Sequence, residues 1–249
     1  MKNIINNMFE VEVRDRVAII MIKEDVFKLI TTEHESLFDS LNSFESDNQI
    51  KAVLFQNTPE CYGEKVYESF LKENMLPFNE LEDFELPNFC NKNVRFRELN
   101  ILNRFIKYFL DYKKLCFSLL SGGIVTPFFG ASLSTDIRFA TPEMYFSLAH
   151  NKYGLHPSGA LPYFLTTQLG YNRAMEIMFS EKVSAQEALN LGLINKIVSG
   201  ENALDLVLSD IKKITKLRSC TLRRTKQLSS YVLDSLSDYF EYEASLLNL

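Results

Sequence analysis

The sequence lacks a cluster of positive charge. Its 27 Lys and Arg residues are outnumbered by 32 Asp and Glu residues, which gives a formal net charge of -5 at pH 7. Nucleic-acid binding requires a concentrated basic surface that neutralises phosphates. The basic pairs at positions 212–213 and 223–224 lie among apolar residues and are typical of helix faces. The charge pattern therefore argues against a nucleic-acid partner.

Cysteines with metal-binding spacing are also missing. The four cysteines are Cys61, Cys90, Cys116 and Cys220, and none belongs to a C-x-x-C pair or has a histidine nearby. This spacing supports neither a zinc motif nor a disulfide framework. We therefore expect no metal site, and we expect reduced thiols of the kind found in cytosolic proteins.

Long hydrophobic runs are absent as well. No uncharged apolar stretch approaches the roughly 20 residues that a membrane-spanning helix needs. The first residues, MKNIINNMFEVEVRDR, show no apolar run of a signal peptide ahead of their charges. We therefore expect a soluble, cytoplasmic protein without a membrane partner. Hydrophobic residues make up 46% of the 249 residues and charged residues 24%, which is ordinary for a globular domain with a sizeable core.

Short apolar segments that predict strands are spread over the first 150 residues. Residues 9–13 and 17–22 flank a charged tripeptide and predict a β-hairpin. Further strands are predicted at 50–55, 115–120, 136–140 and 144–146. A helix is expected to begin at Thr31, because a threonine cap followed by acidic residues suits a helix N-terminus.

Helical patterns become dominant later in the chain. Residues 56–93 contain three prolines and an acidic patch, and they predict a loop with short helical pieces that could form a lid over a site. Helices are predicted over 97–112, from Pro127, over 160–169, 172–179 and 185–190, and from about residue 202 onward. This order predicts an α/β domain over residues 1–198 and a C-terminal helical segment over residues 199–249.

Several motifs follow one another in a fixed order between Leu115 and Val198. A strand leads into Ser121-Gly122, a short helix leads into Asp136-Ile137-Arg138-Phe139-Ala140, and the turn Tyr153-Gly154-Leu155-His156-Pro157 comes next. Leu169-Gly170, Arg173-Ala174 and the segment from Val183 to Val198 complete the series. In this order, the motifs resemble those of the crotonase (enoyl-CoA hydratase/isomerase) superfamily. The resemblance extends back to the strand Lys51-Ala52-Val53-Leu54 and covers roughly residues 11–198.

The resemblance implies a fold, a substrate class and an assembly. The fold is an α/β, crotonase-like ββα spiral with a C-terminal helical trimerisation segment. The substrate is an acyl thioester, presented by coenzyme A or by an acyl-carrier protein, so coenzyme A is expected as part of the substrate and no separate cofactor is expected. Family members assemble through their C-terminal helices, so the resemblance also implies a homotrimer or a hexamer.

Two backbone amides polarise the thioester oxygen in the family. Gly63 is similar to the glycine of the first loop, which makes the amide of Glu64 the first donor and places Tyr62 and Lys65 beside it. The second donor position falls on Pro127, which has no N–H. Either Phe128 donates after a shift of one residue, or a single amide remains.

The family's two acid–base carboxylates are missing from this chain. Gly130 and His150 occupy the two glutamate positions of hydratases, and Ser158 occupies the later position that some isomerases use. The resemblance therefore disfavours enoyl-CoA hydration, which uses both carboxylates. His150 could exchange a proton or hold a carboxylate group of the substrate, or it could be a hydrogen-bonded histidine without chemistry.

The remaining candidate residues each have two interpretations. Tyr62, Tyr153 and Ser158 either line the substrate pocket or serve packing and capping. Lys65 and Lys152 either meet coenzyme phosphates as point charges or are solvated surface lysines. His156 is interpreted as a turn histidine.

Three functions fit these departures from the family pattern. The first is a lyase, isomerase or decarboxylase acting on the thioester, since Lys152-Tyr153-Gly154 is similar to a turn of crotonase-like decarboxylases in polyketide assembly. The second is a degenerate pseudoenzyme that binds an acyl thioester or serves as a scaffold subunit, with Phe128 and Phe129 filling the pocket. The third is hydration by recruited residues such as Glu64 or Glu68. The sequence favours the first function and favours hydration least.

Overall fold

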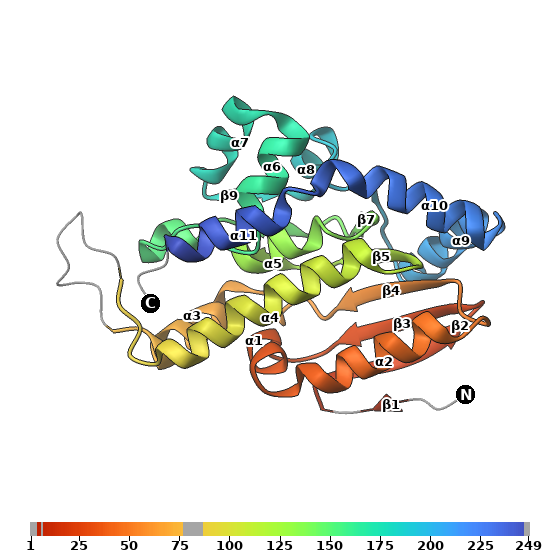
Figure 1. Cartoon of the computed structure of the whole chain (residues 1–249), viewed down its shortest axis with the longest axis horizontal. Helices are drawn as coiled ribbons and strands as arrows, with labels where there is room; N and C mark the ends of the chain where they lie inside the picture. Colours follow the sequence, from red (N-terminus) through yellow and green to blue (C-terminus); the bar gives the residue numbers. More distant parts are fainter. Residues whose placement is uncertain (1–3, 6, 77–86, 247–249) are drawn as a thin grey trace.

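A seven-stranded mixed sheet forms the centre of the molecule (Figure 1). The computed structural model describes residues 4–5, 7–76 and 87–246. The strand order is β1 (Ile4–Ile5), β2 (Phe9–Arg14), β3 (Val17–Ile22), β4 (Ala52–Asn57), β5 (Leu115–Leu120), β7 (Ile137–Ala140) and β10 (Lys196–Ile197). The β1, β2 and β3 neighbours pair antiparallel, and the pairs from β3 to β10 are parallel. This arrangement confirms the predicted α/β architecture.

The predicted hairpin is confirmed. β2 and β3 pair with Val11 opposite Ile20, and the turn residues Asp15 and Arg16 have φ values of 47° and 68°. A two-residue turn with both residues in the left-handed region matches the twist of antiparallel strands. The polar turn therefore sets the register that places alternate apolar side chains on opposite faces of the sheet.

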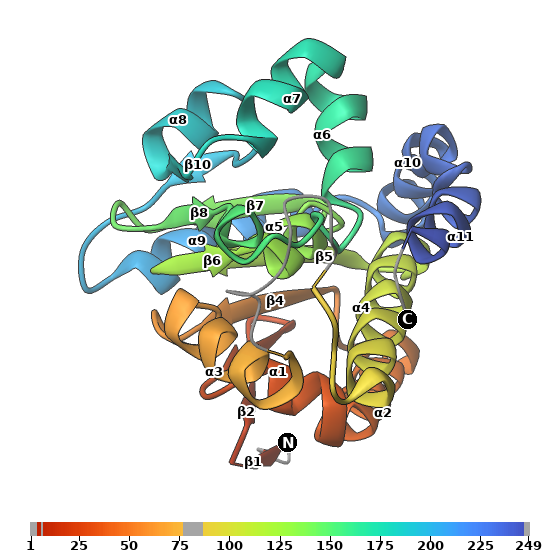
Figure 2. The same cartoon turned by 90° about the vertical axis from the view of Figure 1, so that its left-hand side faces the viewer.

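Helices cover both faces of this sheet (Figure 2). One face buries Ile19, Leu54 and Phe117 against α9 (Ala203–Thr215), whose Val207 and Ile211 are fully buried. The opposite face carries the larger core and packs against the helices that surround the candidate site. The alternation of apolar residues along the strands accounts for both layers.

A second, three-stranded sheet lies beyond the first. It consists of β6 (Gly123–Val125), β8 (Tyr145–Ser147) and β9 (Lys182–Ser184). The buried helix α5 (Thr126–Ser132) follows β6 directly. Phe129 of α5 stacks on Phe146 of β8 with ring centroids 3.8 Å apart, so this helix is fixed to the small sheet as it crosses the core.

The predicted helix start at Thr31 is wrong. The helical segment begins earlier with α1 (Val26–Lys28), continues through a π-helical turn over Leu29–Glu33 and passes into α2 (His34–Ser46). Asp25 caps it, because its carboxylate accepts from the amides of Phe27 and Lys28 at 2.8 and 3.1 Å. Thr31 instead donates to the carbonyl of Phe27 inside the helical segment.

The prediction of a loop over residues 56–93 is also wrong in part. Glu64–Asn74 forms the helix α3, whose apolar stripe of Tyr67, Phe70 and Leu71 is buried. The next helix, α4 (Lys92–Asp111), begins at Lys92 rather than near residue 97, because the side chain of Asn91 caps it. The central part of the proposed lid, residues 77–86, lies outside the described residues.

The last part of the chain is helical, as predicted. The turn η2 (Ala149–Tyr153) precedes α6 (Leu161–Leu169), α7 (Tyr171–Met178) and α8 (Ala185–Asn190), and α10 (Ser219–Ser230), η3 (Tyr231–Leu233) and α11 (Leu236–Ser245) follow α9. In both views α11 lies beside α4 (Figures 1 and 2). The division of the chain at residues 198/199 stays a prediction. In the part of the chain that the structure describes, no helix is both long and apolar enough to cross a membrane.

Candidate functional site

Two loops that are far apart in the sequence meet beside α5. The amide of Val125 donates to the carbonyl of Tyr62 at 3.0 Å, and the rings of Tyr62 and Phe128 lie 5.0 Å apart. Gly122 (φ 69°) allows this approach, because a Cβ atom there would lie 2.2 Å from the carbonyl oxygen of Pro59. The Tyr62–Glu64 loop and the start of α5 are thus held side by side.

The amino ends of two helices belong to these loops. Gly63 is the N-cap of α3, and its carbonyl accepts from the amide of Tyr67 at 3.2 Å. The amide of Glu64 therefore precedes the first intrahelical hydrogen bond and has no acceptor within the helix. Phe128 is the third residue of α5, after Val125 as N-cap, Thr126 and Pro127, and its amide also lies in the first turn, where amides have no acceptor within the helix. Both helix dipoles favour negative charge at these ends.

Gly130 has no room for a side chain. A Cβ atom at this position would lie 2.1 Å from the carbonyl oxygen of Gly159 and 2.9 Å from the amide nitrogen of Leu161. Gly159 (φ 70°) packs equally closely, since its Cβ would lie 2.2 Å from the carbonyl oxygen of Pro127. The turn before α6 thus occupies the space that a carboxylate on residue 130 would need.

A chain of hydrogen bonds links the two loops to His150. Glu64 Oε1 accepts from Ser147 Oγ at 2.7 Å. Thr126 Oγ1 lies 3.2 Å from the carbonyl oxygen of Ser147 and 2.7 Å from His150 Nδ1. Neither Ser147 nor a role for Thr126 was predicted from the sequence, where each is only a hydroxyl residue inside an otherwise apolar segment.

His150 is held as a neutral imidazole. Its side chain is 2% exposed, and burial, with a smaller effect of His156, lowers its pKa from 6.5 to about 4. A carbonyl oxygen can only accept, so the Thr126 hydroxyl donates to Ser147 and accepts from His150 Nδ1–H. Nε2 therefore carries the lone pair, with low basicity.

The other predicted site residues divide into two groups. Tyr153 and Ser158 are buried, and the Tyr153 ring lies 5.8 Å from that of Tyr67 on α3. Lys65 and Lys152 are exposed, and the Lys152 ammonium lies 5.2 Å from the centroid of the Tyr153 ring. The structure thus joins Tyr62, Gly63, Glu64, Pro127, Phe128 and His150 through the contacts described above, and it leaves the two lysines at the surface.

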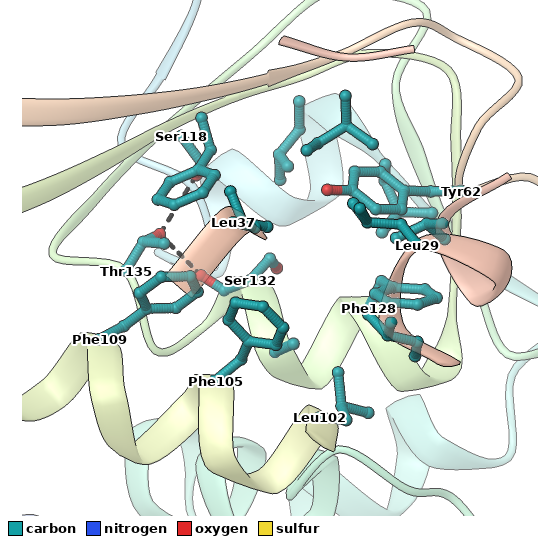
Figure 3. A pocket seen from close by; sticks show the side chains of 17 residues that line it. Leu29, Leu37, Tyr62, Leu102, Phe105, Phe109, Ser118, Phe128, Ser132 and Thr135 are labelled. Carbon is teal, nitrogen blue, oxygen red and sulfur yellow. Dashed lines mark hydrogen bonds between the residues drawn. The ribbon is translucent and has the colours of Figure 1, made fainter. Parts of the chain in front are cut away.

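A cavity of about 90 Å³ lies directly beside Tyr62 and Phe128 (Figure 3). Strands of the large sheet, α4, α5 and the segment from α1 to α2 contribute to its lining. Its lining is almost entirely apolar and comprises Ile22, Val26, Leu29, Ile30, Leu37, Phe55, Tyr62, Leu102, Phe105, Phe109, Ser118, Leu120, Ile124, Phe128, Ala131, Ser132 and Thr135. Phe128 narrows this space without filling it, whereas Phe129 points toward the small sheet.

A buried group of charged residues was not found from the sequence. Arg95 and Glu98 of α4 form an ion pair at 1% and 0% exposure, and Glu243 of α11 is 5% exposed. Arg95 Nε, Glu98 Oε1 and both Glu243 oxygens have no hydrogen-bond partner among the residues that the structure describes. Burial raises the pKa of Glu243 to about 7; the backbone amide of Ala160 and the charge of Arg95 oppose this rise, and Glu98 adds to it.

No group of three or more His, Cys, Asp or Glu residues that could hold a metal ion occurs within the described ranges. The four cysteines are free; Cys61 and Cys116 are buried, and Cys90 and Cys220 are exposed. The polar groups at this site are therefore backbone amides, hydroxyls, one neutral imidazole and one carboxylate.

Comparison with known proteins agrees with this architecture. A family model described as enoyl-CoA hydratase/isomerase matches residues 106–248. Among solved structures, the fold is similar to an enoyl-CoA hydratase from Bacillus halodurans (TM-score 0.76, 18% identity, 96% of this chain and 93% of that chain). It is also similar to an enoyl-CoA hydratase/isomerase from Cupriavidus metallidurans CH34 (TM-score 0.72, 22% identity, 97% and 89%). Pseudomonas aeruginosa DspI matches with a TM-score of 0.70 at 18% identity over 98% and 96% of the two chains.

These identities are low, so the likeness to the solved structures carries the fold alone. The family model covers more than half of the 249 residues. The low identities are consistent with the departures at positions 127, 130 and 150 that the sequence analysis identified. The chain belongs to the enoyl-CoA hydratase/isomerase (crotonase) family, as a divergent member.

Proposed function

We propose that this protein binds an acyl thioester between the Tyr62–Glu64 loop and the start of α5, and stabilises an enolate by two backbone amides. The observation that carries the proposal is the convergence of two helix N-termini beside an apolar cavity. The amides of Glu64 and Phe128 would donate to the thioester oxygen. Such donors contribute roughly 3 to 4 kcal/mol each when they are aimed at developing negative charge.

The proposed chemistry is of the lyase, isomerase or decarboxylase type. Each of these reactions breaks a bond at the carbon next to the thioester and places the electron pair on the thioester oxygen. Two amides in an apolar site stabilise that charge without a carboxylate pair. A proton then returns to carbon, and Glu64 and His150 are the titratable groups nearest to the two loops along the hydrogen-bond chain.

Hydration is disfavoured by the same geometry. Residue 130 has no room for a carboxylate side chain, because the backbone of the Gly159 turn lies where its Cβ atom would be. His150 is a weak base, since burial lowers its pKa to about 4. Glu68 pairs with Lys72 at 2.8 Å on the exposed side of α3. Water activation by two opposed carboxylates therefore has little support.

A second candidate function is a binding subunit without turnover. Its supporting observation is that the polar side chains beside the two loops are engaged with one another: Ser147 donates to Glu64, and Thr126 bonds His150. Such a protein would retain an acyl thioester and serve as a scaffold or carrier subunit.

The proposed assembly is a homotrimer or a pair of trimers. Large apolar side chains on α10 and η3 are exposed in the single chain: Leu228 at 77%, Tyr231 at 75% and Val232 at 70%. Exposed apolar residues gathered on one segment are typical of an interface. Sedimentation at micromolar protein concentration tests this proposal, and a monomer at all concentrations would contradict it.

The functional proposal is tested by binding followed by turnover. Calorimetry with acetyl-CoA and butyryl-CoA should show saturable binding, with free coenzyme A as the control for contacts outside the acyl site. Crotonyl-CoA should show no water addition, whereas a malonyl-type thioester tests for release of carbon dioxide. Hydration of crotonyl-CoA would refute the assignment of enolate chemistry. Binding without any turnover would favour the carrier function.

A further inference from the structure

The cavity beside the two loops has a limited size and an apolar lining. Its volume is about 90 Å³. An apolar cavity of about 150 Å³ accommodates benzene, with six carbons, so by proportion this one accommodates roughly four carbons. Phe55, Phe105 and Phe109 form one wall, with the rings of Phe55 and Phe109 4.9 Å apart.

The hydroxyl groups at one end of the cavity are already satisfied. Thr135 Oγ1 donates to the carbonyl of Ser132 at 2.8 Å and lies 3.2 Å from Ser118 Oγ. Ser132 Oγ donates to the carbonyl of Phe129 at 2.7 Å. This end therefore presents methylene and methyl surface and suits the end of an alkyl chain (Figure 3).

Tyr62 differs from these hydroxyl residues. Its phenol oxygen points from the loop side into the cavity (Figure 3), and burial raises the pKa of this phenol well above its usual value, so it stays protonated. It has no hydrogen-bond partner within the part of the chain that the structure describes. Tyr62 is half-buried, and a hydroxyl that faces a cavity without a protein partner is a donor available to a ligand.

We propose that this cavity selects a short acyl chain of about four carbons that carries an oxygen substituent, to which the Tyr62 hydroxyl donates a hydrogen bond. The proposal rests on the proposed function, because it takes the thioester to lie at the Glu64 and Phe128 amides. The ligand class is a short 3-hydroxyacyl or 3-oxoacyl thioester. The chain extends from the loops toward Phe109, and the phenol distinguishes the oxygenated chain from the saturated one.

Binding of a series of saturated acyl-CoA esters tests the size limit. Each added methylene should increase affinity about fourfold while it is buried, so calorimetry should show a rise from two to four carbons and a loss of that gain beyond about six. Phe109→Ala should move the optimum to longer chains. Phe109→Leu is a milder second variant, and Phe179→Ala, at a 73% exposed position, is the control that leaves the profile unchanged.

The hydrogen bond is tested with Tyr62→Phe. The wild type should bind 3-hydroxybutyryl-CoA more tightly than butyryl-CoA, and the variant should lose roughly three- to tenfold on the hydroxylated ester alone. Thermal unfolding confirms that each variant is folded. Equal losses on both esters would overturn the role of the phenol, and affinity rising steadily to ten carbons would overturn the size limit. Failure of every ester to bind would refute the proposed function itself.

Discussion

Glu243 makes the stability of this protein depend on pH in a way that one substitution can isolate. It occupies the inner face of α11 with Leu236 and Phe240, a position where an apolar residue would pack without cost. Neither of its oxygens makes a well-formed hydrogen bond in the described part of the chain; the backbone amide of Ala160 and the guanidinium of Arg95 offset its charge only in part, because Arg95 is already paired with Glu98. When α11 is docked, the carboxylate form of Glu243 therefore recovers little of the free energy that it loses on leaving water.

The magnitude follows from linkage between protonation and folding. The pKa of Glu243 rises from 4.5 to about 7 on folding, chiefly because of burial. The folded state thus holds this proton more tightly than the unfolded state. The stabilising effect of the proton is complete below pH 4.5 and is lost as the pH rises through 7. At 1.36 kcal/mol for each pH unit of difference, the loss is roughly 3 kcal/mol at pH 8.

Glu243→Gln should remove this dependence, because the amide mimics the protonated carboxyl at every pH. Urea unfolding at pH 5, 6, 7 and 8 should show stabilities of variant and wild type within about 1 kcal/mol of each other at pH 5. The variant should become more stable by roughly 3 kcal/mol at pH 8. Glu241→Gln, at an exposed position of the same helix, is the matched control. A difference between Glu243→Gln and wild type that stays constant over this range would refute the reasoning.

Three further substitutions test packing around the site. Gly130→Ala places a Cβ 2.1 Å from the Gly159 oxygen and should cost about 3 kcal/mol or more of unfolding free energy; a change below about 1 kcal/mol in urea unfolding would contradict the close packing. Ala131→Leu fills part of the 90 Å³ cavity, so it should raise the free energy of unfolding by up to about 2 kcal/mol. The same variant should abolish butyryl-CoA binding in calorimetry. Unchanged binding would place the ligand outside this cavity. Lys226→Met removes the ammonium that bonds Asp136 at 2.9 Å and two backbone carbonyls. It should lower the free energy of unfolding in urea by about 3 kcal/mol. An unchanged free energy of unfolding would show that α10 docks without this ammonium.

The sequence predicted those features that depend on local patterns. The hairpin of β2 and β3 follows from apolar alternation around a charged turn. The helix predicted over residues 185–190 is α8, and the structure shows Ser184 and Glu187 forming a reciprocal cap at its start. The helix start at Thr31 was wrong because a second polar cap, Asp25, lies a turn and a half earlier and leaves the threonines inside the helix.

Features that depend on contacts between distant segments could not be predicted. Gly130 was recognised as a missing carboxylate, but the backbone of Gly159 that closes the space comes from another turn. Arg95 and Glu98 are spaced as a helical ion pair, yet their burial against Glu243 depends on how α11 docks on α4. The sequence therefore identified which groups are absent from the site, while the structure determines what occupies their place.

The central claim is that the amides of Glu64 and Phe128 bind a thioester oxygen. A crystal structure with butyryl-CoA or 3-hydroxybutyryl-CoA tests this claim most directly. We expect the thioester oxygen within about 2.7 to 3.1 Å of both amide nitrogens, with the acyl chain in the cavity beside Tyr62 and Phe109. A bound thioester whose oxygen lies away from both amides, or an acyl chain outside the cavity, would contradict the account.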